Sequence, residues 1–179
     1  MQLYTNRLLI RPFLISDLPD VYEYCSQDGV GTNAGWAAHK SPEESGQILG
    51  EWISAGNKHA IVLLESDKVV GHISVDPDSE ENRADTREIG CALNLRYQRK
   101  GIMTEALQAV LEYLFESDTA EFVWACCFQS NAASKGMIEK CGFKFVQNGV
   151  FFASSLGREF PSYEYRISKS EWQQNRQHK

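Results

Sequence analysis

A short basic turn, Gln98-Arg99-Lys100-Gly101, joins an apolar stretch to an amphipathic stretch that begins at Ile102. A glycine turn that leads into a helix leaves the first backbone N–H groups of that helix without intrahelical partners. These donors and the positive end of the helix dipole attract anions, phosphates above all. Arg96, Arg99 and Lys100 add positive charge at the same place. The pattern predicts either a phosphate-binding turn or an ordinary strand-to-helix connection with exposed basic residues.

A second polar segment follows the apolar stretch 122–128 and opens another predicted helix. It contains Asn131 and Ser134, three residues apart. Open α/β sheets bind ligands in the crevice at the carboxyl ends of their strands, so these side chains are expected to face the same space as the basic turn. The alternative is that Ser130 or Asn131 only caps the helix.

Apolar periodicity predicts one domain over residues 1–179, with a core from about residue 5 to 168, in which strands and helices alternate. Strong signals include a serine cap before Pro42 and an apolar stripe that starts at Met103. The sequence predicts a mixed sheet with helices on both sides. The expected strands cover residues 7–11, 60–64, 69–75, 88–95, 122–128, 143–152 and 163–167, and the expected helices cover 16–26, 41–53, 102–114 and 131–141.

The composition excludes several classes of protein. Hydrophobic residues make up 42% and charged residues 23% of the 179 residues, as in soluble globular proteins. There is no apolar run of about 20 residues, and the first residues lack the features of a signal peptide, so a cytoplasmic protein without membrane contact is expected. The net charge of −6 argues against nucleic-acid binding. The five cysteines lack metal-ligand spacing, so reduced thiols and no metal site are expected.

Three motifs in order resemble the GCN5-related N-acetyltransferase (GNAT) superfamily, and within it the branch that acetylates the N-termini of ribosomal proteins. Its acyl-CoA signature falls on Gln98, Gly101 and Met103, where methionine replaces the usual glycine or alanine. A methionine still offers its backbone N–H, and its flexible side chain is expected to turn toward the core. The other two motifs are Asn131-x-x-Ser134 followed by Glu139-Lys140-Cys141-Gly142-Phe143, and the opening stretch Thr5-Asn6-Arg7-Leu8-Leu9-Ile10-Arg11-Pro12 followed by Asp17.

The resemblance implies the GNAT fold, of class α/β (α+β), and acetyl-CoA as co-substrate. Its central sheet would be mixed but mostly antiparallel, with about seven strands flanked by four helices. A V-shaped splay would separate the strands that end near Leu95 and Phe128, and acetyl-CoA would lie in it with its pyrophosphate on the basic turn. The implied cofactor-binding residues are Leu93, Asn94, Leu95, Gln98, Arg99, Lys100, Gly101, Ile102, Met103, Thr104, Asn131 and Ser134.

Acetyl transfer to nitrogen requires a neutral amine, and an α-amine, with a pKa near 8, is easier to deprotonate than a lysine, with a pKa near 10.4. Glu88 is the first candidate for the base, unless it is only an edge carboxylate paired with Arg87 or with solvent. His72 is the second candidate, unless it is simply packed in the core. By resemblance, Ser134 would protonate the leaving thiolate, and a backbone N–H near Leu95 would stabilise the oxyanion.

The acceptor wall is expected around Trp36 and His39 in the loop 27–40, with Glu88 and Phe151 on the sheet. The resemblance implies the α-amine of a protein, such as a ribosomal protein, as acceptor. The alternatives are a small amine (a polyamine, an amino acid or an aminoglycoside-like antibiotic) and a CoA-binding module without turnover. A monomer and a homodimer are both compatible with the sequence.

Overall fold

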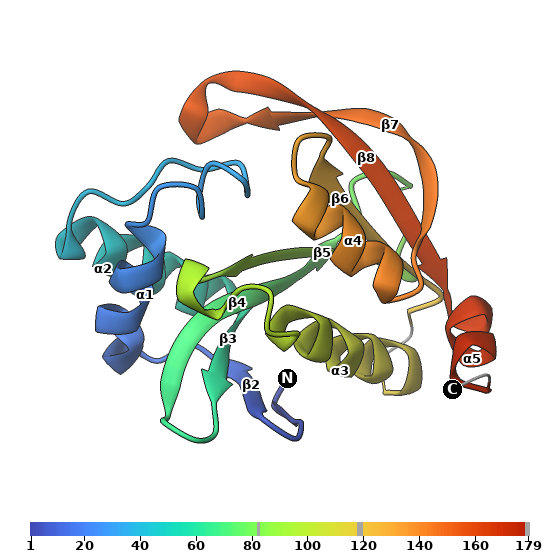
Figure 1. Ribbon diagram of the computed structural model, residues 1–179, viewed down its shortest axis with the longest axis horizontal. Helices are drawn as coiled ribbons and strands as arrows, with labels where there is room; N and C mark the ends of the chain where they lie inside the picture. The colour runs from blue at the N-terminus through green and yellow to red at the C-terminus, as the bar shows by residue number, and fades with distance from the viewer. Residues whose placement is uncertain (82, 118–119, 178–179) are drawn as a thin grey trace.

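A computed structural model describes residues 1–81, 83–117 and 120–177. Their strands form one sheet in the order β1-β2-β3-β4-β5-β6-β8-β7, with α-helices on both faces (Figure 1). The strands are β1 (Leu3–Tyr4), β2 (Leu8–Pro12), β3 (Lys58–Leu63), β4 (Lys68–Pro77), β5 (Thr86–Leu93), β6 (Phe122–Phe128), β7 (Lys144–Ala153) and β8 (Arg158–Ser168). The α-helices are α1 (Leu18–Cys25), α2 (Pro42–Ala55), α3 (Ile102–Glu116), α4 (Ala132–Lys140) and α5 (Lys169–Gln177).

This architecture confirms the predicted mixed, mostly antiparallel sheet, with one strand and one α-helix more than expected. The additional strand, β1, has two residues and pairs with β2 at the edge of the sheet. The additional helix, α5, buries only Trp172, whose ring centroid lies 5.5 Å from that of Phe115. A helix with a single buried residue has no apolar stripe, so periodicity cannot reveal it.

Local signals set the bounds of the predicted helices. The Ser41 hydroxyl accepts a hydrogen bond from Glu44 N–H at 3.2 Å, and Pro42 is the first residue of α2, as predicted. Gly142 follows α4 with φ of 95°, a left-handed conformation that glycine adopts at least cost. No helix of the described residues is long and apolar enough to cross a bilayer.

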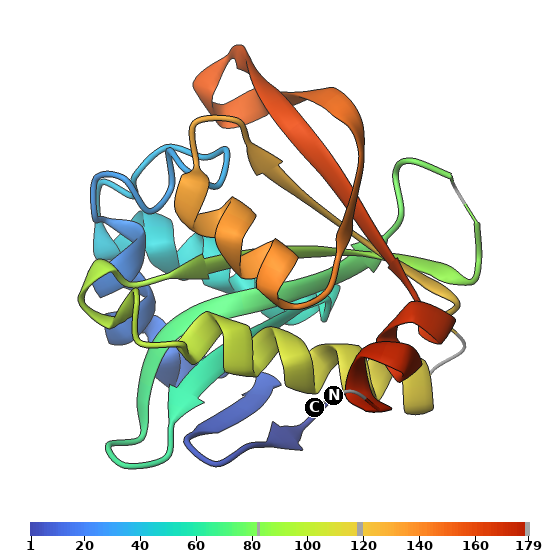
Figure 2. The same ribbon diagram turned by 45° about the vertical axis from the view of Figure 1, so that its right-hand side comes forward.

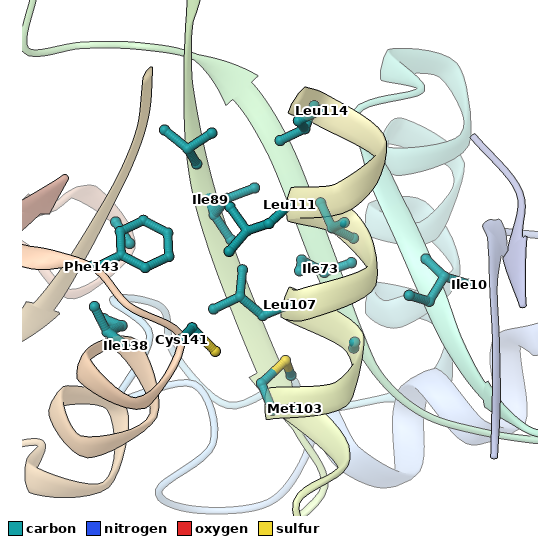
Figure 3. Close-up of a cluster of buried hydrophobic side chains, with 14 of the residues drawn as sticks. Ile10, Ile73, Ile89, Met103, Leu107, Leu111, Leu114, Ile138, Cys141 and Phe143 are labelled. Carbon is teal, nitrogen blue, oxygen red and sulfur yellow. The ribbon is translucent and has the colours of Figure 1, made fainter. Parts of the chain in front are cut away.

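Two apolar clusters cover the two faces of the sheet. The predicted stripe of α3 is buried against Ile73 and Ile89, together with Ile138 of α4 (Figure 3). On the opposite face, α1 and α2 bury Tyr24 and Leu49 against the middle strands. Because side chains alternate along a strand, β4 and β5 send every second side chain to each face. The buried stripe of α3 consists of Met103, Ala106, Leu107, Val110, Leu111 and Leu114.

The predicted V-shaped splay lies between β5 and β6, the parallel pair of the sheet. Their pairing runs from Thr86 with Phe122 to Ile89 with Ala125 and then ends. Beyond that point β5 continues to Leu93 and β6 to Phe128, and the two strands diverge (Figure 1). The sheet is therefore open between these two strands from Gly90 onward.

Candidate active site

The basic turn has the backbone of an anion site. Gly101 has φ of 76° and Arg99 has φ of 60°, so two of its residues are left-handed. No side chain caps α3, and the first intrahelical bond joins Glu105 N–H to Gly101 O at 3.0 Å. The N–H groups of Ile102, Met103 and Thr104 consequently have no intrahelical acceptor. The turn fits a pyrophosphate, because these donors and the helix dipole point to the same place.

A brace ties this turn to the start of β2. The Glu105 carboxylate accepts hydrogen bonds from Thr5 Oγ1 at 2.6 Å and from Arg7 Nε at 2.7 Å. Arg7 Nη1 also donates to Lys100 O at 3.1 Å. These contacts join residues about a hundred positions apart, so the opening motif of the chain fixes the turn in place.

Met103 has turned its side chain into the core, as expected for its departure from the family signature. It is 9% exposed and lies in the cluster beneath α3, near Cys141 (Figure 3). The start of α3 therefore presents the backbone N–H of Met103, while the thioether is buried. A methionine at this position leaves the backbone donors in place.

The edge of β5 presents main-chain groups to the splay. Asn94 N–H donates to a β4 carbonyl at 2.8 Å, and antiparallel pairing alternates, so the main-chain groups of Leu93 point away from β4. Leu93 O accepts from Gln98 Nε2 at 3.0 Å, and Leu95 N–H donates to Gln27 Oε1 at 3.0 Å. The Leu95 donor is thus already engaged, whereas Leu93 N–H faces the opening.

Asn131 and Ser134 lie at the start of α4, on the β6 side of the splay. Asn131 is the N-cap of this helix, and its Oδ1 accepts from Ser134 N–H at 3.0 Å. Its Nδ2 also donates to Asn33 O at 3.4 Å. The half-buried Ser134 hydroxyl makes no hydrogen bond to any residue that the structure describes. Ser134 thus has a free hydroxyl at the predicted position.

Glu88 lies where β5 and β6 make their last two pairs. It is half-buried, and Ser79 Oγ donates to its Oε2 at 2.8 Å. Burial raises the pKa of Glu88, the Ser79 hydrogen bond opposes this, and the charges of Asp76 and Asp78 add to the increase. A carboxylate with a raised pKa is a better proton acceptor than an exposed glutamate.

His72 is enclosed on the face of the sheet that α1 and α2 cover. Its Nδ1 lies 3.0 Å from the Tyr24 hydroxyl, and its ring centroid lies 4.8 Å from that of Trp52. Burial lowers the pKa of His72 to about 3, so the ring is neutral at ordinary pH. This environment matches the packing alternative.

The loop 27–40 contains Trp36 and His39, the other two residues predicted to border the acceptor substrate. The half-buried Trp36 packs so closely on Gly31 that a Cβ there would lie 2.5 Å from the indole ring. His39 is buried, its Nδ1 lies 2.8 Å from Ser45 Oγ, and burial lowers its pKa. Both side chains anchor the loop, and neither faces solvent freely.

The same loop meets the β7–β8 hairpin and the start of α4 (Figure 2). A Cβ on Gly35 would lie 2.5 Å from the Phe151 ring, and Ala37 N–H donates to Ser155 Oγ at 3.3 Å. The Phe151 ring centroid is 5.5 Å from that of Phe128 at the end of β6. Phe151 therefore lies where the loop, the hairpin and the open end of β6 meet.

The structure adds Glu164, which the sequence reasoning did not single out. It lies on β8 opposite Cys126 of β6 and is 8% exposed. The only signal in the sequence is the polar alternation of Ser162, Glu164 and Arg166 in a strand where apolar residues are expected. No disulfide joins the five cysteines, and the described residues contain no group of three or more His, Cys, Asp or Glu side chains that could hold a metal.

The geometry agrees with the comparisons to known proteins. A family model described as an acetyltransferase (GNAT) domain matches residues 7–144. The chain belongs to the GNAT acetyltransferases. It is an N-acetyltransferase that uses acetyl-CoA as the acetyl donor.

Several proteins resemble this GNAT chain over nearly its full length. "Uncharacterized N-acetyltransferase YnaD" of Bacillus subtilis is 31% identical over 96% of this chain and 99% of its own. The structure of a GNAT-family acetyltransferase from Bacillus anthracis has a TM-score of 0.84 and 27% identity, covering 95% of this chain and 99% of its own. The Microcin C7 self immunity acetyltransferase MccE, solved with acetyl-CoA and AMP, shares the fold at 16% identity, with a TM-score of 0.76 over 92% and 93% of the two chains.

Proposed function

We propose that this GNAT enzyme acetylates a primary amine by direct attack on the thioester, with Glu88 as the base and the N-terminal α-amine of a protein as acceptor. This proposal rests on the position of Glu88. It lies in the last stretch of β5–β6 pairing, directly before the strands separate, and burial raises its pKa. A proton acceptor is therefore available at the base of the splay.

The donor would be held largely by main-chain groups. The N–H groups of Ile102, Met103 and Thr104 would bind the pyrophosphate, with Arg99 and Lys100 supplying positive charge. The outward-facing carbonyl of Leu93, which has a second lone pair beside the one that Gln98 uses, would accept from an amide of the pantetheine arm, as in an added strand. Asn131 would contact the same arm from the other wall. This assignment rests on the open backbone groups described above.

Glu88, Ser134 and solvent together account for the proton transfers. The Glu88 carboxylate accepts one proton from the acceptor ammonium, and the freed nitrogen lone pair forms the C–N bond as the carbonyl electrons move to oxygen. Leu93 N–H would donate to that oxyanion, because Leu95 N–H is engaged with Gln27. As the C–S bond breaks, Ser134 donates its hydroxyl proton to the thiolate. The second proton of the nitrogen then restores the Ser134 hydroxyl through solvent.

A protein acceptor is favoured by one distant likeness in fold. The ribosomal-protein-S5-alanine acetyltransferase of Vibrio fischeri has a TM-score of 0.75 and 17% identity, with 96% of this chain and 98% of its own covered. An α-amine also needs less help from a base than a lysine does. A small amine is the second candidate, because the carboxylates near the splay suit any cationic acceptor. A binding module without turnover is disfavoured, since the turn and the Ser134 hydroxyl are both intact.

Acetyl-CoA consumption with a panel of acceptors tests the proposal. The panel contains a peptide with a free N-terminus, the same peptide with a blocked N-terminus, spermidine, free amino acids and an aminoglycoside. We expect turnover with the free peptide and none with the blocked one, measured as thiol release. Turnover with spermidine or the aminoglycoside alone would support the small-amine alternative. Tight CoA binding without turnover on any amine would contradict both.

A further inference from the structure

Glu164 is a buried carboxylate without a cationic partner. It is 8% exposed, and its Oε1 accepts a hydrogen bond from Ser162 Oγ at 2.5 Å. No hydrogen bond or ion pair joins Oε2 to the residues that the structure describes, and this oxygen is not sealed from solvent. Buried charges are ordinarily paired, because an unpaired charge is costly to remove from water. The side chain therefore lacks a partner that a bound cation would supply.

Nearby negative charges disfavour the ionised form of Glu164 further. Burial raises the pKa of Glu164, the Ser162 hydrogen bond opposes this, and the charges of Glu80 and Glu88 raise it further. The closest cation along β8, Arg166, is engaged in an ion pair with Glu81 and lies over the ring of Trp124, 5.4 Å from its centroid. Arg166 therefore does not neutralise Glu164.

The strand register puts Glu164 and Glu88 on one face of the sheet. Glu88 pairs with Trp124, and Glu164 pairs with Cys126, two residues further along β6. Side chains two residues apart share a face, so the two carboxylates lie on either side of β6, where it leaves β5. The charge of Glu88 raises the pKa of Glu164, which agrees with this placement. They thus border the opening from opposite strands.

Two further features define the surroundings of the Glu164 carboxylate. Gly149 of β7 passes so close to Glu164 that any side chain there would run into its carboxylate. Further along the same face, Phe128 stacks on Phe160 with centroids 4.4 Å apart, and Phe151 adjoins them. The carboxylate therefore lies next to an aromatic surface.

We propose that Glu164 is an acceptor-specificity residue, which together with Glu88 binds the ammonium form of the acceptor before deprotonation. This inference rests on the proposed function. Two carboxylates repel an acceptor that carries its own carboxylate beside the amine, so the site selects amines without one. A peptide N-terminus or a polyamine satisfies this condition, and a free α-amino acid does not. The aromatic surface accommodates an apolar group next to the amine.

L-Phenylalaninamide and L-phenylalanine test this selection, because they differ only in the carboxylate. We measure kcat and KM for both with the wild type and with Glu164→Gln. The two amines differ in basicity, so the decisive quantity is the change in their kcat/KM ratio between the two proteins. We expect the ratio to favour the amide in the wild type and to shrink about tenfold in Glu164→Gln, mainly through a higher KM for the amide. The Kd for CoA is expected to stay the same.

Glu159→Gln is the matched control, because Glu159 is an exposed carboxylate on the same strand. It is expected to leave the ratio as in the wild type. Glu164→Gln removes a buried charge without a counter-ion, so its Tm is expected to equal or exceed that of the wild type. Gly149→Ala, which displaces the same carboxylate, is a second variant that should also raise the KM for the amide.

An unchanged ratio in Glu164→Gln overturns the proposal, as does a variant that does not fold, because the carboxylate would then serve the structure. A wild type that acetylates no amine in the acceptor panel overturns the proposed function as well. These outcomes are distinguishable, since only the last one affects the wild type.

Discussion

The two sides of the β5–β6 splay are built from different parts of the chain. In the proposed function the donor side is main chain, and most of it comes from one contiguous stretch, Gln98 to Thr104. The acceptor side consists of side chains, with Glu88 from β5, Phe151 from β7 and Glu164 from β8. One side depends on backbone conformation, and the other depends on which strands lie next to each other.

This difference explains why the donor side tolerates variation. Met103 can replace a glycine or alanine because the group that matters is its N–H, while the thioether is absorbed by the core. On the acceptor side, a change of one side chain alters the charge or shape that the acceptor meets. Substitutions on the two sides should therefore separate CoA binding from turnover and selectivity.

The largest expected effect belongs to Glu88→Gln on the acceptor side. Loss of a general base lowers kcat by about 10² to 10⁴-fold, while the Kd for CoA is unchanged. In the wild type, activity should rise with pH as Glu88 loses its proton, with a midpoint above the ordinary glutamate value because its pKa is raised. A pH–rate profile checks this, with the exposed Glu65→Gln as control. A variant that keeps the wild-type rate and acidic limb would remove Glu88 from the mechanism.

Gly101→Val tests the donor side. The left-handed φ of 76° strains a β-branched residue, so the turn should change conformation and lose its aligned donors. We expect the Kd for CoA to rise about 100-fold, a loss of about 2.7 kcal/mol, as measured by calorimetry. Gly136→Ala is the control, because this α4 glycine has open space around it and no positive φ. Unaltered CoA affinity in Gly101→Val would refute the position of the pyrophosphate.

Ser134→Ala should have a smaller effect, on turnover alone. The cap of α4 uses the backbone N–H of Ser134, so the variant keeps the bond to Asn131 and its Tm. Loss of the hydroxyl proton donor is expected to lower kcat about tenfold, since water can partly replace it. Steady-state kinetics measure this, with exposed Ser130→Ala as control. Equal kcat values for Ser134→Ala and the wild type would show that the thiolate is protonated by another group.

Away from the donor and acceptor sides, the enclosure of His72 predicts a change in stability with pH and none in turnover. Its folded pKa of about 3 lies below the unfolded value of about 6.5, so the stabilising contribution is full above pH 6.5 and is lost as pH falls toward 3. In that window His72→Phe should reduce the slope of unfolding free energy against pH by up to about 1.4 kcal/mol per unit. Urea unfolding between pH 4 and 7 measures the slope. An equal slope in both proteins would mean that His72 is not buried in its neutral form.

Much of the fold followed from local patterns. The buried stripe of α3, the Ser41 cap and the bounds of β6 depend on neighbours within a few residues, which periodicity and capping rules describe. The two residues of β1 are too few to form a pattern, and α5 depends on the contact of Trp172 with Phe115 of α3, so no local pattern revealed either element. Likewise, Gln27 accepts from the N–H of Leu95, near which the family resemblance placed the oxyanion donor. A hydrogen bond between residues 68 positions apart cannot be predicted from a local sequence pattern.

The sequence by itself indicated the donor side, because a glycine before an apolar stripe predicts a helix start with free N–H groups. The contacts that Thr5 and Arg7 make with Glu105 and Lys100 then hold this turn in place. Only the tertiary structure decided the acceptor side. The order β5-β6-β8-β7 places β6 between Glu88 and Glu164, and burial then raises both pKa values. Burial and the distance between charges are properties of the assembled sheet, so only the tertiary structure shows that Glu164 is buried without a cationic partner.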